Sequence, residues 1–294
     1  MTSEIVIRDV EQKMTETFGE QVKVLSSNTL GGGCINHASK LDTNVGTYFL
    51  KWNANCPADM FQREAEGLIE LEKAASGALK IPKVICYREV GEHPGFLVMD
   101  YFAPGSTGDA DEKLGRGLAM IHRYKNDTFG FERNNYCGDT PQSNQQEEDW
   151  ITFFREQRLN YILSLIRQQR SLSVEERKVY EKLSRRLSEL IPAGEHPSLI
   201  HGDLWSGNYM LTSDGPALID PAAYYANREM EFGIVTMFGG FSSRFFAAYN
   251  EVYPLDKDWQ NRNKLYQLYH ILNHYYLFGG GYGAQALRVA KAYL

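Results

Sequence analysis

The sequence predicts an α+β protein of two lobes, a small β-rich N-terminal lobe with one main helix and a larger, mainly helical C-terminal lobe. Strand-like patterns fill most of the first third of the chain, and helical periodicity dominates after it. The length of 294 residues is also near the limit of what one hydrophobic core supports. We therefore expect an N-terminal lobe over residues 1–102 and a C-terminal lobe over residues 103–294.

The N-terminal lobe is expected to follow a β-β-β-α-β-β order after a short helix. Apolar residues recur at helical spacing near the N-terminus, and later segments alternate apolar and polar residues between turn signals. The expected elements are a helix over 3–18, strands within 21–30, 38–43 and 45–52, a helix from Pro57 to Gly77, and strands within 82–90 and 95–102.

The C-terminal lobe begins after APGSTGDAD (103–111), a linker rich in turn-forming residues. Helical periodicity predicts helices over 110–124, 149–169 and 174–190. The polar segment 125–148 is expected to be an extended, irregular surface loop. Two small strands are expected around HGDLWSGN and ALIDPA, and helices such as KLYQLYHILNHYYLF follow.

Composition excludes several classes of protein. The net charge is −6 and no Lys/Arg block stands out, which argues against nucleic-acid binding. The four cysteines form no C-x-x-C pair, as a structural zinc site or a disulfide framework would require. The N-terminus lacks a signal-peptide core, and the longest apolar stretches are too short to span a membrane. We expect a cytoplasmic protein that acts as a monomer or weak homodimer.

The stretch LIHGDLWSGNYML carries the pattern H-x-D-x-x-x-x-N, made by His201, Asp203 and Asn208, and Asp220 ends the next apolar run. Metal-assisted phosphoryl transfer needs these residue types: Asp203 can accept the proton of an attacking hydroxyl, and Asn208 and Asp220 can supply oxygens to Mg²⁺. The alternative is a polar turn with Asx-type hydrogen bonds. The pattern arises by chance on the order of once in a hundred chains of this size, so context decides.

A cation for the phosphates is available in the strand VGTYFLKWN. Alternation places Phe49 and Lys51 on one face of this strand, and the next helix offers Glu64 as a partner for an inward-pointing lysine. The alternative is that Lys51 is solvated at the end of the strand.

The segment GGGCIN interrupts two predicted strands upstream of that lysine. Gly31, Gly32 and Gly33 would let backbone N–H groups approach phosphates, as in a phosphate-covering hairpin. The same glycines would also suit a flexible turn. The order of these features along the chain is nevertheless that of a protein-kinase-like fold. It runs from the glycine hairpin through the strand lysine, the helix glutamate, the linker and the helices to H-x-D-x-x-x-x-N and the final aspartate.

Three segments, LIHGDLWSGN, FLVMDY and IDPAAYYANREMEFG, resemble the fructosamine kinase (ketosamine-3-kinase) family, which is grouped with aminoglycoside and choline kinases. The resemblance covers essentially the whole chain. It implies that Asp203 is the catalytic base, that Asn208 and Asp220 bind Mg²⁺, and that Lys51 contacts the ATP phosphates and pairs with Glu64.

The resemblance also implies roles around the nucleotide and the acceptor. The backbone from Asp100 to Phe102, next to Met99, would hold adenine as the hinge between the lobes. Trp205 would form part of the sugar site, since an indole can cover the apolar face of a sugar; packing beneath the loop is the alternative. The residues expected to hold the metal loop against the following helix are Tyr224, Tyr225, Arg228 and Glu229.

The implied reaction is ATP-dependent phosphorylation of the 3-hydroxyl of a ketosamine, a fructosamine or ribulosamine adduct that is free or protein-bound. Its outcome would be deglycation, a form of protein repair. Two alternatives stay open: a small-molecule kinase of the same fold that acts on an aminoglycoside, choline or a sugar, and a catalytically inactive nucleotide-binding protein.

Cys34 lies in the glycine hairpin, close to the expected position of Lys51. Backbone amides and a nearby cation favour the reactive thiolate, so reversible inhibition by oxidation of Cys34 is a hypothesis. The alternative is a small residue that fills a hairpin. Full peroxide sensitivity in a Cys34→Ala variant would refute the hypothesis.

Overall fold

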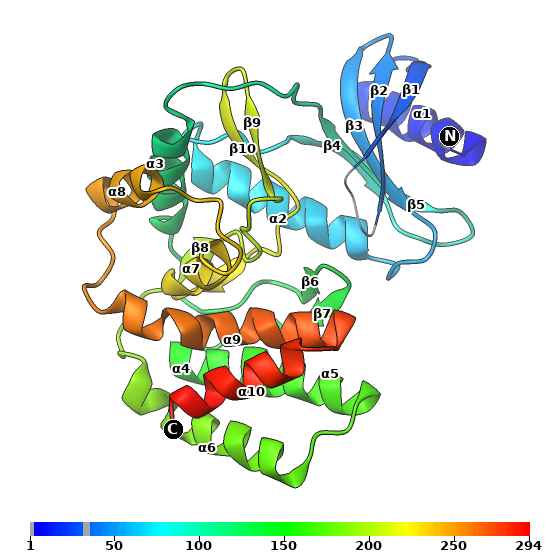
Figure 1. Ribbon diagram of the computed structural model, residues 1–294. Helices are drawn as coiled ribbons and strands as arrows, with labels where there is room; N and C mark the ends of the chain where they lie inside the picture. The colour runs from blue at the N-terminus through cyan, green and yellow to red at the C-terminus, as the bar shows by residue number, and fades with distance from the viewer. Residues whose placement is uncertain (1–2, 32–35) are drawn as a thin grey trace.

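The chain folds into two lobes that meet at a cleft, as the sequence predicted (Figure 1). The structure is a computed structural model, and it describes residues 3–31 and 36–294. In Figure 1 the N-terminal sheet lies at the upper right, and the C-terminal helices form the lower half of the molecule. No helix within these two ranges is both long and apolar enough to cross a bilayer.

The N-terminal lobe is a five-stranded antiparallel sheet in the order β1-β2-β3-β5-β4. Its strands are β1 (Val24–Leu30), β2 (His37–Thr43), β3 (Gly46–Asn53), β4 (Val84–Arg88) and β5 (Gly95–Asp100). Successive side chains of a strand point to opposite faces of the sheet, so the strands contribute to two separate cores. Leu50 and Val98 pack with helix α1 (Glu4–Phe18), whereas Leu97 and Met99 pack with helix α2 (Met60–Ala75).

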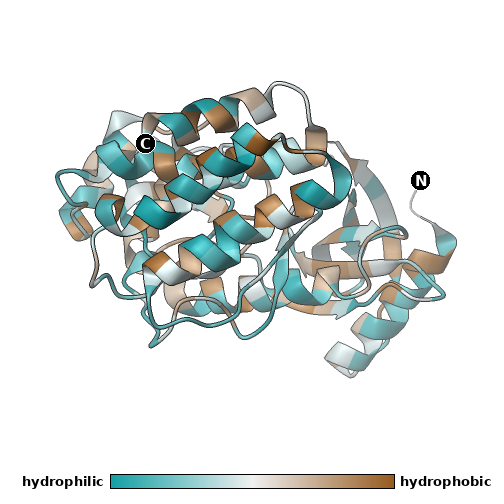
Figure 2. Cartoon of the chain, turned by 90° about the horizontal axis from the view of Figure 1, so that it is seen from below, coloured by the Kyte–Doolittle hydropathy of each residue, from teal (hydrophilic) through white to brown (hydrophobic). Residues whose placement is uncertain are grey.

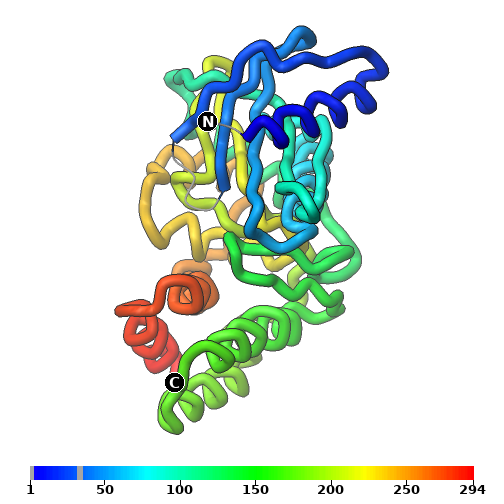
Figure 3. The backbone as a smooth tube through the Cα atoms, turned by 90° about the vertical axis from the view of Figure 1, so that its right-hand side faces the viewer, coloured from blue at the N-terminus to red at the C-terminus, as the bar shows by residue number. Residues whose placement is uncertain are grey.

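The C-terminal lobe surrounds an aromatic-rich core beneath the cleft. Its helices are α3 (Ala110–His122), α4 (Trp150–Phe153), α5 (Tyr161–Gln169), α6 (Val174–Leu190), α7 (Glu229–Val235), α8 (Ser243–Val252), α9 (Trp259–Phe278) and α10 (Tyr282–Ala292). In Figure 3, α9 and α10 run beside α5 and α6 in the lower part of the molecule, and α9 contacts α5 while α10 contacts α6. Seen from below in Figure 2, these helices alternate hydrophilic and hydrophobic segments, as amphipathic helices do.

The single helix predicted over 149–169 is interrupted by a π-helical stretch, Phe154–Asn160. Within it Arg158 is fully buried and stacks on the ring of Tyr224, 3.8 Å from the ring centroid. Its guanidinium donates to the carbonyl of Ser143 and to Asn144 Oδ1. Side-chain periodicity could not reveal the wider turn, because it depends on these partners from other segments.

The expectation of an irregular surface loop over 125–148 was wrong. The segment contains a hairpin of strands β6 (Asn135–Cys137) and β7 (Thr140–Gln142), and several of its polar side chains are buried. Asn135 Nδ2 donates to the carbonyl of Ala223 at 2.9 Å, and Gln142 Nε2 donates to the carbonyl of Ala222 at 3.2 Å. Polar composition indicated exposure, but these amides satisfy backbone groups that would otherwise be buried without partners.

Candidate active site

The segment His201–Asn208 is held between two short antiparallel strand pairs. Strand β8 (Ser198–Ile200) pairs with β11 (Tyr224–Ala226), and β9 (Tyr209–Thr212) pairs with β10 (Gly215–Leu218). Gly202 has φ +83°, and a Cβ there would lie 2.2 Å from the carbonyl oxygen of Ala222. Only glycine therefore lets this loop lie so close to the chain that follows Asp220.

Asp203, Asn208 and Asp220 lie together in the cleft. Asn208 Nδ2 donates to Asp203 Oδ2 at 3.0 Å and to the backbone oxygen of Asp203 at 2.9 Å. Asp220 adopts φ +54°, an uncommon conformation for a residue with a side chain. Such conformations are concentrated at functional sites, where the surrounding structure maintains them.

Lys51 joins the two lobes at this point. Its Nζ lies 2.8 and 2.9 Å from the Glu64 carboxylate oxygens and 3.0 Å from Asp220 Oδ1. Burial alone would lower the pKa of Lys51, but the charges of Asp220 and Glu64 outweigh burial and raise it. The lysine therefore stays charged inside the cleft. The alternative of a lysine solvated at the strand end was wrong.

The loop that carries Asp203 is anchored from below by Glu231, a fully buried residue of α7. Its carboxylate accepts hydrogen bonds from the backbone N–H groups of His201 at 2.6 Å and Gly202 at 3.0 Å. Charge-assisted hydrogen bonds of this kind are stronger than neutral ones. Two of them fix the backbone immediately before Asp203.

Glu231 was not among the residues predicted from the sequence, and part of this anchoring role was predicted for its neighbours Arg228 and Glu229. Arg228 instead donates to the carbonyls of Tyr253 and Pro254, and Glu229 forms an ion pair with Arg262 at 2.6 Å. The run EMEFGIV did contain a signal, an acid placed between Met230 and Phe232. The direction of that acid depends on how α7 packs.

The environment of Asp203 makes it a stronger base than an ordinary carboxylate. Burial, followed by the charges of Glu231 and Asp220, raises the pKa of Asp203 from 3.8 to about 8. Behind it, ligand atoms of Cys137, His270 and Asp203 all lie within 4.8 Å of one another. Burial raises the pKa of the Cys137 thiol and lowers that of His270 to about 3, so both stay neutral. No positive charge from these two groups stabilises the carboxylate.

The donor atoms at the front of the cleft fit Mg²⁺. Asn208 and Asp220 both line the cleft, and they offer an amide oxygen and a carboxylate, the hard ligands that Mg²⁺ prefers. Mg²⁺ also keeps several waters and uses substrate phosphates as ligands, so two protein ligands are sufficient. The sulfur of Cys137 and the imidazole of His270 are softer ligands, and both residues are buried and do not line the cleft.

The cleft has a volume of about 600 Å³. The predicted site residues that line it are Gly31, Lys51, Glu64, Met99, Asp100, Phe102, Asp203, Trp205, Asn208 and Asp220. Trp205 is 40% exposed, so the alternative that it packs beneath the loop was wrong. Gly32, Gly33 and Cys34 lie outside the described residues, and the redox hypothesis for Cys34 stays a prediction.

Helix α2, which carries Glu64, is tied to the C-terminal lobe at both ends. Near the cleft, Tyr136 of β6 donates to Asp59 Oδ1 at 2.7 Å. At the far end, Tyr225 of β11 donates to Glu70 Oε1, also at 2.7 Å. Since Tyr136 itself lines the cleft, the β6–β7 hairpin supports both the cleft wall and the helix.

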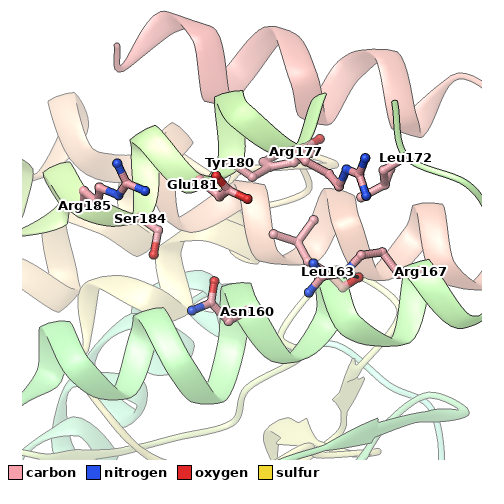
Figure 4. A pocket seen from close by; sticks show the side chains of 9 residues that line it. All are labelled: Asn160, Leu163, Arg167, Leu172, Arg177, Tyr180, Glu181, Ser184 and Arg185. Atoms are coloured by element: carbon pink, nitrogen blue, oxygen red, sulfur yellow. Dashed lines mark hydrogen bonds between the residues drawn. The ribbon is translucent and has the colours of Figure 1, made fainter. Parts of the chain in front are cut away.

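A second hollow of about 190 Å³ lies between α5 and α6, in the lower part of the C-terminal lobe (Figure 4). Arg167, Arg177 and Arg185 line it together with Glu181. Among the described residues, none of the predicted site residues lines this hollow.

Comparison with known proteins agrees with this geometry. The sequence model of the fructosamine kinase family matches residues 6–294. A probable ketoamine kinase of Synechocystis sp. is 36% identical over 285 residues, which cover 96% of this chain and 95% of that protein. The chloroplastic protein-ribulosamine 3-kinase of Arabidopsis thaliana is 36% identical over 285 residues, covering 95% and 85%.

Solved structures show the same fold. A structure from Thermobifida fusca, assigned to the fructosamine-3-kinases, superposes with a TM-score of 0.86 at 30% identity, covering 98% of this chain and 99% of that one. An aminoglycoside phosphotransferase in complex with ADP and hygromycin B superposes with a TM-score of 0.66 at 18% identity, covering 97% of each chain, and supports the kinase-like fold alone. Over its full length, this chain belongs to the fructosamine kinase family.

Proposed function

We propose that this protein transfers the γ-phosphoryl group of ATP to the 3-hydroxyl of a ketosamine. One observation carries the proposal: Lys51, paired with Glu64 and Asp220, lines the same cleft as the carboxylate of Asp203. Phosphoryl transfer requires little covalent chemistry from a protein and depends on positioning and electrostatics. The cleft supplies both.

In the proposed reaction, the acceptor hydroxyl gives its proton to an oxygen of Asp203, which must be ionised for this step. Mg²⁺ bound nearby would favour the ionised form over the protonated form that predominates at neutral pH without the metal. The hydroxyl oxygen then bonds to the γ-phosphorus as the bond to the bridging oxygen breaks, and ADP leaves. Lys51 holds the phosphates, and Asn208 holds the Asp203 carboxylate in position through its amide. Mg²⁺ bound by Asn208 and Asp220 would neutralise charge on the phosphates.

The adenine ring would bind where Met99, Asp100 and Phe102 line the cleft between the lobes. Asp100 is the last residue of strand β5, and its backbone N–H donates to the carbonyl of Lys83 at 3.0 Å. This pairing orients the start of the segment that joins the lobes. The purine would stack between apolar side chains and bond to exposed backbone groups of that segment.

The acceptor site is proposed to be the part of the cleft next to Trp205. Indole faces cover the apolar faces of sugars, and Trp205 is half-exposed two residues from the base. The names of the relatives, ketoamine kinase and protein-ribulosamine 3-kinase, favour a ketosamine over an aminoglycoside or choline. Phosphate is a better leaving group than hydroxide, so a 3-phosphorylated ketosamine can eliminate phosphate and release its amine. That sequence of steps is deglycation.

The test is an incubation with Mg-ATP and four acceptors: a ribulosyl-amine, a fructosyl-amine, an aminoglycoside and choline. ADP release and the mass of each acceptor are measured, with Asp203→Ala as the inactive control. A gain of one phosphoryl group on a ketosamine, absent with the variant, is the expected result. Phosphorylation of another acceptor alone would leave the kinase and refute the substrate.

A further inference from the structure

A row of aromatic side chains leads from the cleft to the outer surface. The row consists of Trp205, Phe238, His274, Phe278 and Tyr282. Ring centroids lie 6.2 Å apart between Trp205 and Phe238 and 5.3 Å apart between Phe238 and His274. From His274, Phe278 lies at 5.7 Å and Tyr282 at 5.1 Å. The rings therefore form one continuous row across the loop His201–Asn208, the segment after α7, and the junction of α9 with α10.

This aromatic row is unusually exposed. Phe238 is 47% exposed and Phe278 is 69% exposed, and with Trp205 they place three large apolar side chains on one path. Isolated exposed apolar residues are ordinary, but contiguous ones mark binding surfaces. Since the row starts inside the cleft, its exposed part is continuous with the acceptor site.

The row is held in place by the structure around it. Gly239 and Gly240 follow Phe238 with φ of +75° and +95°, and a Cβ at Gly240 would lie 2.6 Å from Ser206 Cβ. Tyr209 Oη donates to the carbonyl of Gly240 at 3.1 Å, which fastens this turn against the catalytic loop. His274 Nδ1 donates to the carbonyl of His270 at 2.8 Å. The rings thus form a preorganised surface.

We propose that the aromatic row binds the lysine side chain and flanking peptide of a protein-bound ketosamine. The inference rests on the proposed function, because it concerns the part of the acceptor that carries the sugar. When the 3-hydroxyl lies at Asp203, the sugar's first carbon and its nitrogen must extend away from the base. Trp205 lines the cleft, and the ring centroid of Phe238 lies 6.2 Å from that of Trp205, so these are the two rings that this end of the acceptor would meet first.

The chemistry of a glycated lysine matches the row. Its secondary amine is cationic at neutral pH, and cations are attracted to the faces of Trp, Phe and Tyr rings. Its four methylene groups span about 6 Å when extended, close to one step of the row. Beyond them the peptide backbone and neighbouring side chains would reach Phe278 and Tyr282 at the surface. A small free ketosamine would occupy only the inner end.

The test compares two substrates in variants of the outer row. The substrates are ribulosyl-methylamine and a short peptide that carries one ribulosylated lysine, and the variants are Phe278→Ala and Phe238→Ala. Phe18→Ala is the matched control, because Phe18 is a 39% exposed phenylalanine on α1. Values of kcat/KM are measured for each pair, with thermal unfolding to confirm that each variant is folded.

We expect Phe278→Ala to lower kcat/KM for the peptide on the order of five- to tenfold, as loss of an apolar anchor does, and to leave ribulosyl-methylamine within about twofold. Phe238→Ala should affect the peptide more than the small substrate, and Phe18→Ala should affect neither. Equal losses on both substrates, or an unchanged peptide, would overturn the role of the row while leaving the kinase intact. If the wild-type protein phosphorylated neither substrate, the proposed function and this inference would fall together.

Discussion

Replacing Asp203 with asparagine should abolish activity and at the same time stabilise the fold. The carboxylate sits where burial and the charges of Glu231 and Asp220 raise its pKa from 3.8 to about 8. In the unfolded chain the group ionises near its ordinary value, so between these two pKa values the folded state binds one more proton. Stability must then fall as pH rises through this window. An asparagine, which resembles the protonated acid in shape, does not carry this cost.

The size of the effect follows from the shift. One pKa unit is worth about 1.4 kcal/mol, so at pH 7 a rise from 3.8 to about 8 corresponds to roughly 4 kcal/mol as an upper limit. Asp203 is partly accessible to water in the cleft, and water would reduce this value. We expect Asp203→Asn to be more stable than the wild type by about 2 kcal/mol at neutral pH.

Urea unfolding without nucleotide or Mg²⁺ measures the difference, in a series from about pH 4 to about pH 8.5. The difference in unfolding free energy between variant and wild type should be small at the acidic end of the series and increase as pH rises. Asp214→Asn is the control, since Asp214 is 73% exposed and pairs with Lys80 at the surface. A gap that is absent, or that does not change with pH, would refute the electrostatic account of this site.

Four further substitutions test the residues that support the site. Glu64→Gln removes a charge from the buried lysine pair and should raise the KM for ATP on the order of tenfold, measured by ATP titration of steady-state rates. Tyr136→Phe removes the hydrogen bond to Asp59 and should lower kcat/KM for ATP severalfold. Tyr225→Phe removes the hydrogen bond to Glu70, farther along α2, and should change thermal stability more than kinetics. Similar kcat/KM values in the two variants would contradict this difference. Glu231→Gln replaces one of the two acceptor oxygens with an NH2 group, which would face the backbone N–H of either His201 or Gly202 without an acceptor. We expect it to cost about 2 kcal/mol or more of unfolding free energy and to lower kcat; an unchanged urea midpoint would argue against the anchor.

Much of the site was predictable because phosphoryl transfer needs particular side chains in a particular order. Lys51, Glu64 and the pattern from Asp203 to Asp220 follow from strand alternation, helix spacing and ligand chemistry. All of these residues line one cleft in the structure. Glu231 was missed because an acid inside an apolar helix gives no direction, and its partners are backbone groups that lie 29 and 30 positions away in the chain.

Partners that are distant in the sequence also explain the two wrong predictions about the fold. A polar segment was expected at the surface, yet Asn135 and Gln142 are buried because they bond to the backbone of residues 222 and 223. A continuous helix was expected over 149–169, yet a π-helical stretch accommodates Arg158 against Tyr224. In both cases the partner is distant in sequence, and local periodicity carries no information about it.

The sequence by itself determined the two-lobed architecture and the family of this protein, and it named the residues that we propose to react. These depend on residue type and on short-range spacing, which are written directly along the chain. Only the tertiary structure decided that the β6–β7 hairpin supports α2, that Glu231 anchors the catalytic loop, and that rings from three segments form the aromatic row. Each of these depends on side chains or backbone groups that are brought together by packing, and packing is set by the whole chain at once.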